Sequence, residues 1–248
     1  MSSNPIPVGF PTPYNTGLRG IGVDPDDLTD DGGGTYSTAD AVIEDLDFTG
    51  TVNINASGIT IRRCRITTTD FYGIRCLGPG TNLTIEDCRI RLHGVNSAAA
   101  ILATDGITIS RCDISGGADS VKFEGDGIVM EDCYLAGNMG KVGVSHNDVI
   151  QTGAGDGMII RRCSIIGPWQ QQTSAILMKS DFAAINDVLV EDSYMSGGNY
   201  TIQFVVGGGG DVTNIVMTDN TFDDDSWNFA YLNDGTAGDL TETGSVFV

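Results

Sequence analysis

A short pattern of apolar and polar residues recurs along the chain. Its clearest copy is Ile128-Val129-Met130-Glu131-Asp132-Cys133-Tyr134-Leu135, in which alternating apolar residues precede two polar residues, a cysteine, a variable residue and a further apolar residue. Eight copies start at residues 41, 59, 83, 107, 128, 158, 188 and 215, spaced by 18 to 30 residues. A unit that repeats at such intervals is typical of a solenoid.

Each copy of the repeat predicts two short strands and a bend. Alternating apolar residues form a strand with one buried face, and the polar pair breaks the alternation, so the chain must turn there with both polar side chains outward. A third alternating segment precedes the repeat, with copies at 72–76, 100–103, 120–123, 149–152, 175–178, 201–204 and 229–232. Glycine-rich corners such as Asp105-Gly106 join these segments.

Three strands and three turns close one coil of a stacked, all-β fold. Coils about 4.8 Å apart pair as parallel strands, and eight of them give a rod of roughly 35–40 Å. The second polar residue of successive copies alternates in sign through the first seven, which suits vertical neighbours on adjacent strands. These residues are Asp45, Arg63, Asp87, Arg111, Asp132, Arg162, Asp192 and, breaking the alternation, Asp219.

Composition limits which partners the protein is expected to bind and in which compartment it is expected. The chain of 248 residues has a net charge of −20 and a pI of about 4.1, which disfavours nucleic acid and anionic membranes as partners. Five of the six cysteines share one inward position of the repeat, so we expect free, buried, stacked thiols. No secretory leader or bilayer-spanning run is present in this chain. We expect an extracellular or virion-associated protein, from which a leader has been removed or which leaves the cell another way, for example inside a virion.

The repeat divides the chain into three parts. Residues 1–40 hold five of the seven prolines and are predicted to cap the first coil, because an open solenoid end is prone to edge-to-edge association. Residues 41–235 form the stack, and residues 236–248 are predicted to close its far end. Longer connections at 136–147, 167–173 and 207–210 are expected on one face, where solenoids often bind ligands.

The outward positions of the third strand collect titratable groups that the charge ladders do not use. Two of the three lysines, Lys122 and Lys179, fall on this face. A lysine held between coils beside apolar groups can act as a base. The predicted catalytic residues are Lys122, His146 and Asp148, and the predicted sugar-binding residues are Arg75, Gln151, Lys179, Gln203 and a stacking tryptophan, Trp169.

Acidic residues on the same face suggest a cation site. Asp119, Glu124 and Asp148 could supply oxygen ligands for Ca²⁺, which would stabilise negative charge that develops on a uronate carboxylate. The competing interpretation is a solvated sheet face with ordinary ion pairs, such as Lys122 with Glu124.

The repeat and two of the third strands resemble the right-handed parallel β-helices of the pectate-lyase-like superfamily, over about residues 41–235. Asp119-Ser120-Val121-Lys122 is similar to the V-D-I-K strand of pectate lyases, and Asn147-Asp148-Val149-Ile150-Gln151 to their G-D-x-I-x-V strand. The resemblance implies a single-stranded right-handed parallel β-helix with Ca²⁺ bound by acids that precede these strands. It also implies proton abstraction by an arginine, for which this chain has no clear counterpart.

A second set of residues resembles β-helix proteins of actinobacteria and their bacteriophages, including minor tail proteins. It comprises Gly9-Phe10-Pro11, Asn15-Thr16-Gly17 and the strand that carries His146, Asp148, Ile150 and Gln151. Three functions stay open. They are a lyase that cleaves an acidic, uronate-containing polysaccharide by β-elimination, a non-catalytic glycan-binding or tail-spike-like protein in a homotrimer or larger assembly, and a glycoside hydrolase with Asp119 and Asp148 as paired carboxylates.

Overall fold

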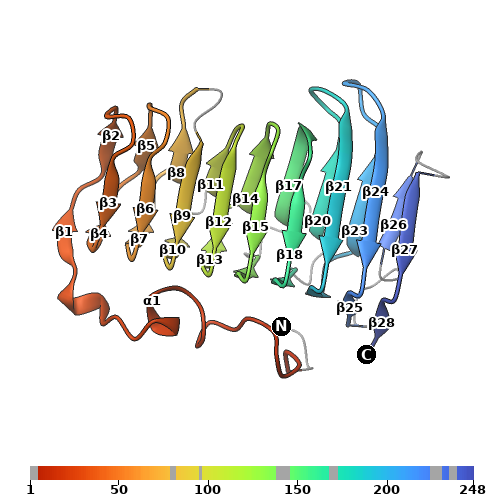
Figure 1. The fold of residues 1–248 in the computed structure, drawn as a ribbon, viewed down its shortest axis with the longest axis horizontal. Coiled ribbons are helices and arrows are strands. Elements are labelled where there is room, and N and C mark those ends of the chain that lie inside the picture. Colours follow the sequence, from red (N-terminus) through yellow and green to blue (C-terminus); the bar gives the residue numbers. More distant parts are fainter. Residues whose placement is uncertain are drawn as a thin grey trace.

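The chain winds into a stack of flattened coils, each with one strand on each of three faces (Figure 1). The computed structural model describes residues 5–78, 82–94, 97–137, 146–167, 173–223, 231–234 and 239–248. Equivalent strands of neighbouring coils pair in parallel, as in β9 with β12 and β11 with β14. The predicted all-β stack of coils is therefore confirmed.

The second strand of each repeat lies on sheet A, which contains β1 (Thr29–Asp31), β4 (Leu46–Phe48), β7 (Arg65–Thr68), β10 (Arg89–Leu92), β13 (Asp113–Gly116), β16 (Tyr134–Ala136), β19 (Ser164–Ile166), β22 (Tyr194–Ser196), β25 (Thr221–Phe222) and β28 (Val246–Phe247). The third strands form sheet B, which contains β2 (Gly34–Tyr36), β5 (Val52–Ile54), β8 (Tyr72–Cys76), β11 (Ala99–Ala103), β14 (Asp119–Glu124), β17 (Asn147–Asp156), β20 (Thr173–Lys179), β23 (Tyr200–Val205) and β26 (Tyr231–Asp234).

The first strand of each repeat lies on sheet C, which contains β3 (Val42–Glu44), β6 (Thr60–Arg62), β9 (Leu83–Glu86), β12 (Ile107–Ser110), β15 (Val129–Glu131), β18 (Ile159–Arg161), β21 (Ile185–Glu191), β24 (Val212–Thr218) and β27 (Leu240–Thr243). Sheets B and C are continuous at β17, which bends around the corner and pairs with both β20 and β21. The core lies between the three sheets and is built from fully buried rows such as Ile61, Ile85 and Ile109.

The polar pair of each repeat forms the bend between sheets C and A, as predicted. The second residue of the pair adopts a left-handed backbone conformation in all eight copies, with φ between 47° and 58°. Aspartate tolerates this conformation better than arginine because its short side chain can hydrogen-bond locally. Gly244 holds the equivalent position near the C-terminus, with φ 72°, where the missing Cβ removes the clash.

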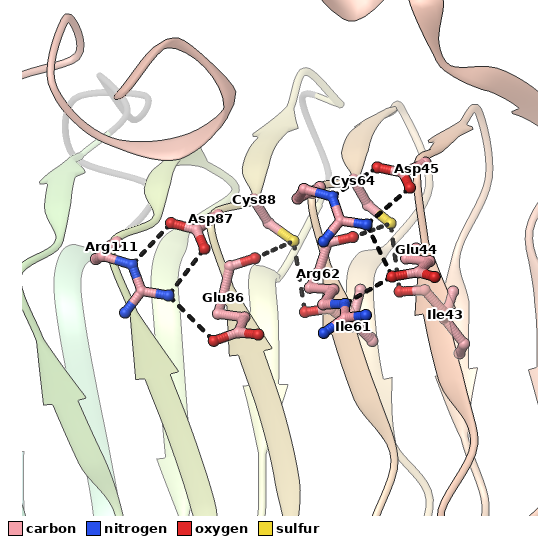
Figure 2. Close-up of polar contacts among 11 residues, drawn as sticks. Ile43, Glu44, Asp45, Ile61, Arg62, Cys64, Glu86, Asp87, Cys88 and Arg111 are labelled. Atoms are coloured by element: carbon pink, nitrogen blue, oxygen red, sulfur yellow. Dashed lines mark hydrogen bonds and ion pairs between the residues drawn. The ribbon is translucent and has the colours of Figure 1, made fainter. Parts of the chain in front are cut away.

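Each ladder arginine reaches back to the acids of the preceding coil, as Figure 2 shows for Arg111 with Asp87 and Glu86. Arg63 Nε donates to Asp45 Oδ1 at 2.8 Å, and Arg63 Nη2 donates to Glu44 at 2.8 Å. The hydrogen bonds from Arg63 hold the pKa of Asp45 below its usual value. The same contact recurs at 2.8 Å in the pairs Arg111–Asp87 and Arg162–Asp132. Because the sign alternates, each of these arginines fixes the register of its own coil against the coil before it.

The repeat cysteines stack behind the bend as a ladder of free thiols. All five are fully buried, as predicted: Cys64, Cys88, Cys112, Cys133 and Cys163. The Cys133 thiol accepts a hydrogen bond from the Cys112 backbone N–H at 3.4 Å. Burial raises the pKa of the Cys88 and Cys133 thiols, so these groups are expected to be unreactive in the folded protein.

The C-terminal tail adds a coil beyond the eight repeats. Strands β26, β27 and β28 pair with β23, β24 and β25, so residues 239–248 continue the stack and do not cap it. Gly244 and Ser245 replace the charged residue and the cysteine of the repeat, which hides this copy in the sequence. In β26, Leu232 pairs with Gln203, one residue after the predicted Tyr231.

Residues 5–28, here called the N-terminal arm, run along the stack rather than over its first coil (Figure 1). The arm contains α1 (Gly17–Gly20) and the 3-10 turn η1 (Pro25–Asp27). The Phe10 ring packs against Tyr194 of β22 with centroids 5.8 Å apart, and the Gly17 N–H donates to the Arg111 carbonyl at 2.7 Å. The arm therefore covers the outer side of sheet A, while β1 and β2 of the predicted cap belong to the stack itself.

Candidate functional site

Sheet B presents one outward row of side chains. The strand register aligns six of them in successive coils: Arg75, Leu102, Lys122, Gln151, Leu177 and Gln203. Neighbours in such a row are about 4.8 Å apart. Lys179 follows Leu177 by two residues on the same strand and forms an ion pair with Asp181 at 2.9 Å. Lys122, Gln151 and Lys179 therefore share one face of the molecule.

Asp119 and Asp148 meet at the beginning of their strands, in consecutive coils. Asp119 is the first residue of β14 and Asp148 is the second of β17. Asp119 Oδ1 accepts a hydrogen bond from the Asp148 backbone N–H at 3.0 Å. The two residues are only 5% and 2% exposed. The charge of Lys122 acts on both carboxyls, so three predicted site residues come together here.

The surroundings of the two carboxyls separate their pKa values. Burial raises the pKa of Asp119 to about 6, against the hydrogen bond from Asp148 and the charge of Lys122. Burial and the charge of Asp119 raise the pKa of Asp148 to about 8, against hydrogen bonds from Ser174 and the charge of Lys122. Both pKa values are raised towards neutrality, so the pair retains a proton to a higher pH than isolated aspartates do, and a protonated carboxyl beside an ionised one is the arrangement of a general acid next to a base.

Ser174 extends the acid pair into a third coil. Its hydroxyl and its backbone N–H both hydrogen-bond to the Asp148 carboxyl. Its Oγ accepts a hydrogen bond from Gln203 Nε2 at 2.5 Å, which ties the predicted sugar ligand Gln203 to the acid pair. Ser174 was not among the site residues predicted from the sequence. Aligning the third strands on their central isoleucines would have placed it in the column of Asp148, with which it pairs.

The remaining predicted residues have weaker ties to the pair. Arg75 lies two rungs before Lys122, with its guanidinium 5.3 Å from the Tyr72 ring centroid. His146 is exposed and directly precedes β17. Lys179 lies beyond Leu177, two rungs after Lys122, with its ion pair to Asp181. Trp169 lies outside the described residues. The roles of these four residues in sugar binding or catalysis stay predictions.

The three predicted calcium ligands do not converge. Glu124 is the last residue of β14, five residues after Asp119 and thus roughly 16 Å further along the strand. Across the described ranges, no three His, Cys, Asp or Glu side chains are grouped closely enough to hold a metal ion. Glu124 therefore does not join Asp119 and Asp148 in a common calcium site, and binding of Ca²⁺ by the other two acids stays a prediction.

Comparison with known proteins supports the fold. Residues 31–149 match the family model described as a right-handed beta helix region, and the predicted single-stranded right-handed parallel β-helix is confirmed. No curated protein matches the sequence. In the described ranges, no helix has the length and apolar character needed to cross a membrane.

Several solved structures are similar to this chain at low identity. The catalytic unit of a thermostable GH87 α-1,3-glucanase from Streptomyces thermodiastaticus strain HF3-3 is 15% identical over 86% of this chain and 49% of that chain, with a TM-score of 0.37. The Dettilon tailspike protein is 13% identical over 86% and 58%, with a TM-score of 0.30. The A-module of the Azotobacter vinelandii mannuronan C-5 epimerase AlgE6 is 12% identical over 94% and 99%, with a TM-score of 0.31.

The chain spans about half the length of the first of these structures. Identities and TM-scores this low carry no conclusion about substrate or activity, so function must be argued from the residues of this chain.

Proposed function

We propose that sheet B binds an acidic polysaccharide and that Asp148 and Asp119 cleave its glycosidic bonds. The observation that carries the proposal is the acid pair itself: two buried carboxyls lie in consecutive coils, Asp119 Oδ1 accepts the Asp148 backbone N–H at 3.0 Å, and the pKa of both carboxyls is raised. The pair borders the outward row of sheet B, where Arg75 and Lys122 offer positive charge to a uronate on a protein whose net charge is −20. Gln151 adds an amide for sugar hydroxyls.

The mechanism needs one proton donor and one proton acceptor. In hydrolysis, Asp148 gives its proton to the leaving glycosidic oxygen while Asp119 takes a proton from the attacking water. In β-elimination, Asp119 takes the proton α to the uronate carboxylate, a carbon–carbon double bond forms, and the leaving oxygen again receives the Asp148 proton. The Lys122 ammonium group would stabilise the negative charge that develops in this second route.

Replacement of Asp148 by asparagine tests the acid role. The wild-type protein is incubated with polygalacturonate and with alginate, and new reducing ends are measured separately from the absorbance of unsaturated ends. We expect new ends from the wild type, unsaturated only if elimination operates. Asp148→Asn should lower the rate roughly 10²- to 10⁴-fold, because an amide cannot give the proton.

Asp126→Asn is the matched control for this experiment. Asp126 Oδ1 accepts the Asp156 backbone N–H at 2.9 Å, the same bond that Asp119 forms with Asp148, but on an exposed corner away from the pair. Its substitution should leave the rate unchanged. Equal rates for Asp148→Asn and the wild type, or no new ends from either polymer, would contradict catalysis by the pair.

A non-catalytic, glycan-binding or tail-spike-like role is the second candidate. It is favoured by the almost complete burial of both carboxyls and by their bonds to the backbone of the next coil, which the corner residues Asp105 and Asp126 also form. In that case the wild type binds polyuronate without shortening it, and Asp148→Asn changes stability alone. A homotrimer in a mass measurement would support an assembly that is extracellular or part of a virion.

A further inference from the structure

An exposed phenylalanine stands beside the outward row of sheet B. Phe182 lies in the turn between β20 and β21 and is 69% exposed. Single exposed apolar residues are ordinary on protein surfaces. Phe182 differs from such residues because the neighbouring coils hold its turn on both sides.

On one side, Phe182 rests on Gly153 of β17. The Phe182 N–H donates to the Gly153 carbonyl at 3.0 Å. Two ring atoms lie 2.8 and 2.9 Å from the place where a Cβ on Gly153 would stand, so only glycine leaves room for the ring. The pairing of β14 with β17 skips Gly153, which forms a bulge. Bulges of this kind re-aim side chains next to functional sites.

On the other side, a loop of four glycines, residues 207–210, locks the turn. Ser180 Oγ accepts the Gly207 N–H at 2.9 Å and donates to the Gly210 carbonyl at 2.5 Å. The Ser180 carbonyl accepts the Gly209 N–H at 2.8 Å. A Cβ on Gly209 would lie 2.4 Å from the Ala183 nitrogen, so this close packing also requires glycine. The backbone that carries the exposed ring is therefore fixed.

The ring adjoins the sugar-binding face at a distance from the acid pair. Gly153 follows Gln151 by two residues on β17 and follows Asp148 by five, or roughly 16 Å along the strand. The ion pair between Lys179 and Asp181 precedes the ring in the same turn, at 2.9 Å. A single sugar cannot touch both Phe182 and Asp148, whereas an oligosaccharide can.

We propose that Phe182 is a stacking platform for one pyranose ring of the glycan that sheet B binds. The inference rests on the proposed function and adds a remote subsite to it. The Cδ2–Cε2 edge of the phenyl ring lies against Gly153 and the side chain is 69% exposed, so a sugar ring can bury its apolar face on the phenyl ring without the entropic cost of ordering the platform. Gln151, Lys179 and Asp181 supply polar groups around it for the hydroxyls.

Affinity electrophoresis in gels that contain polygalacturonate or alginate tests the subsite. All proteins carry Asp148→Asn, so that the polymer stays intact, and each variant is first shown to keep the melting temperature of this parent. Phe182→Ala should weaken the apparent affinity roughly three- to tenfold, and Phe182→Trp should retain it. Gly153→Ala should give the same loss with Phe182 present, because the new Cβ displaces the ring.

Phe71→Ala is the control, since Phe71 is 58% exposed and packs edge-on against Tyr72 at 4.8 Å, in the coil of β8. It should bind like the parent. If Phe182→Ala also binds like the parent, or if neither polymer retards the parent, the subsite is overturned, whatever the cleavage assays show. If the wild type cleaves neither polymer but Phe182→Ala and Gly153→Ala both bind more weakly than the parent, the Phe182 subsite is supported and catalysis by the acid pair is contradicted.

Discussion

At the scale of single residues, one backbone N–H determines which residue types are tolerated at the position that follows the bend of each repeat. The N–H that follows the left-handed residue points inward and needs an acceptor from the next coil. Cys133 supplies a thiol for Cys112, Ser193 supplies a hydroxyl for Cys163 at 3.1 Å, and Asn220 supplies an amide oxygen for Ser193 at 3.0 Å. Any small side chain with an acceptor therefore fits, which explains why copies without cysteine still fold as the repeat.

Substitutions of Cys133 separate its packing from its hydrogen bond. Cys133→Ala should lower the free energy of unfolding by about 1–3 kcal/mol, because it leaves the Cys112 N–H buried without an acceptor. Cys133→Ser should cost less, since a hydroxyl at the equivalent position of Ser193 accepts one hydrogen bond and donates another to the Glu191 carbonyl at 2.9 Å. Urea unfolding measures both. Equal losses for the two variants would show that the thiol acts by packing alone.

At the scale of elements, β14 and β17 place two carboxyls in buried positions, where folding raises their pKa values. Folding raises the pKa of Asp119 and Asp148 from 3.8 to about 6 and about 8. Groups with raised values in the folded state stabilise it below the unfolded pKa, and that contribution is lost as pH rises through the folded pKa. Asp113, buried beside Arg91, shifts in the same direction.

The free energy of unfolding should therefore fall as pH rises from about 4 to about 8. In Asp148→Asn the fall should be smaller above pH 6, where Asp119 has already lost its proton and Asp148 is the group still titrating. Urea unfolding at several pH values across this range measures the slope, with Asp126→Asn as the control that keeps it. A slope of the same size in Asp148→Asn would show that Asp148 does not carry the shifted pKa.

The strands could be predicted from the sequence because their signals are local. Apolar alternation, polar pairs at the bend and aspartate–glycine corners each act within a few residues, as at Asp132-Cys133 and Asp126-Gly127. Asp119 and Asp148 were predicted from the sequence as a pair of carboxylates, but neither their burial nor the hydrogen bond from the Asp148 backbone to Asp119 was predicted. The burial of Asp148 depends on neighbouring coils. The bulge at Gly153 and the contacts that support Phe182 arise between segments that are distant in sequence. No local pattern of residues predicts any of these features.

At the scale of the whole molecule, the N-terminal arm joins coils that otherwise contact only their neighbours. A solenoid has nearest-neighbour stability, so its ends open first. The arm contacts Tyr194 through Phe10 and Arg111 through Gly17, and the chain then continues from it into β1 of the stack. Its path could not be predicted, because residues 5–28 have no periodicity that specifies sheet A.

Deletion of residues 1–28 should weaken the stack along sheet A. Loss of the burial of Leu18, which is 1% exposed, and of the Phe10 contact should lower the free energy of unfolding by about 2–5 kcal/mol. Hydrogen exchange should become faster in β13, β16, β19 and β22, while sheet B strands such as β11 change less. Faster exchange to the same extent on all three faces would mean that the arm stabilises the molecule globally.

The route of the arm has a consequence for synthesis on the ribosome. Tyr194 leaves the ribosome about 180 residues after its partner Phe10, which at about 5–20 residues per second means a delay of roughly ten to forty seconds. Gly17 can bond to Arg111 once the fourth repeat has formed, but the arm can attach along its full length only after the seventh repeat has left the exit tunnel. Nascent chains that are stalled before that point would lack the contact between Phe10 and Tyr194.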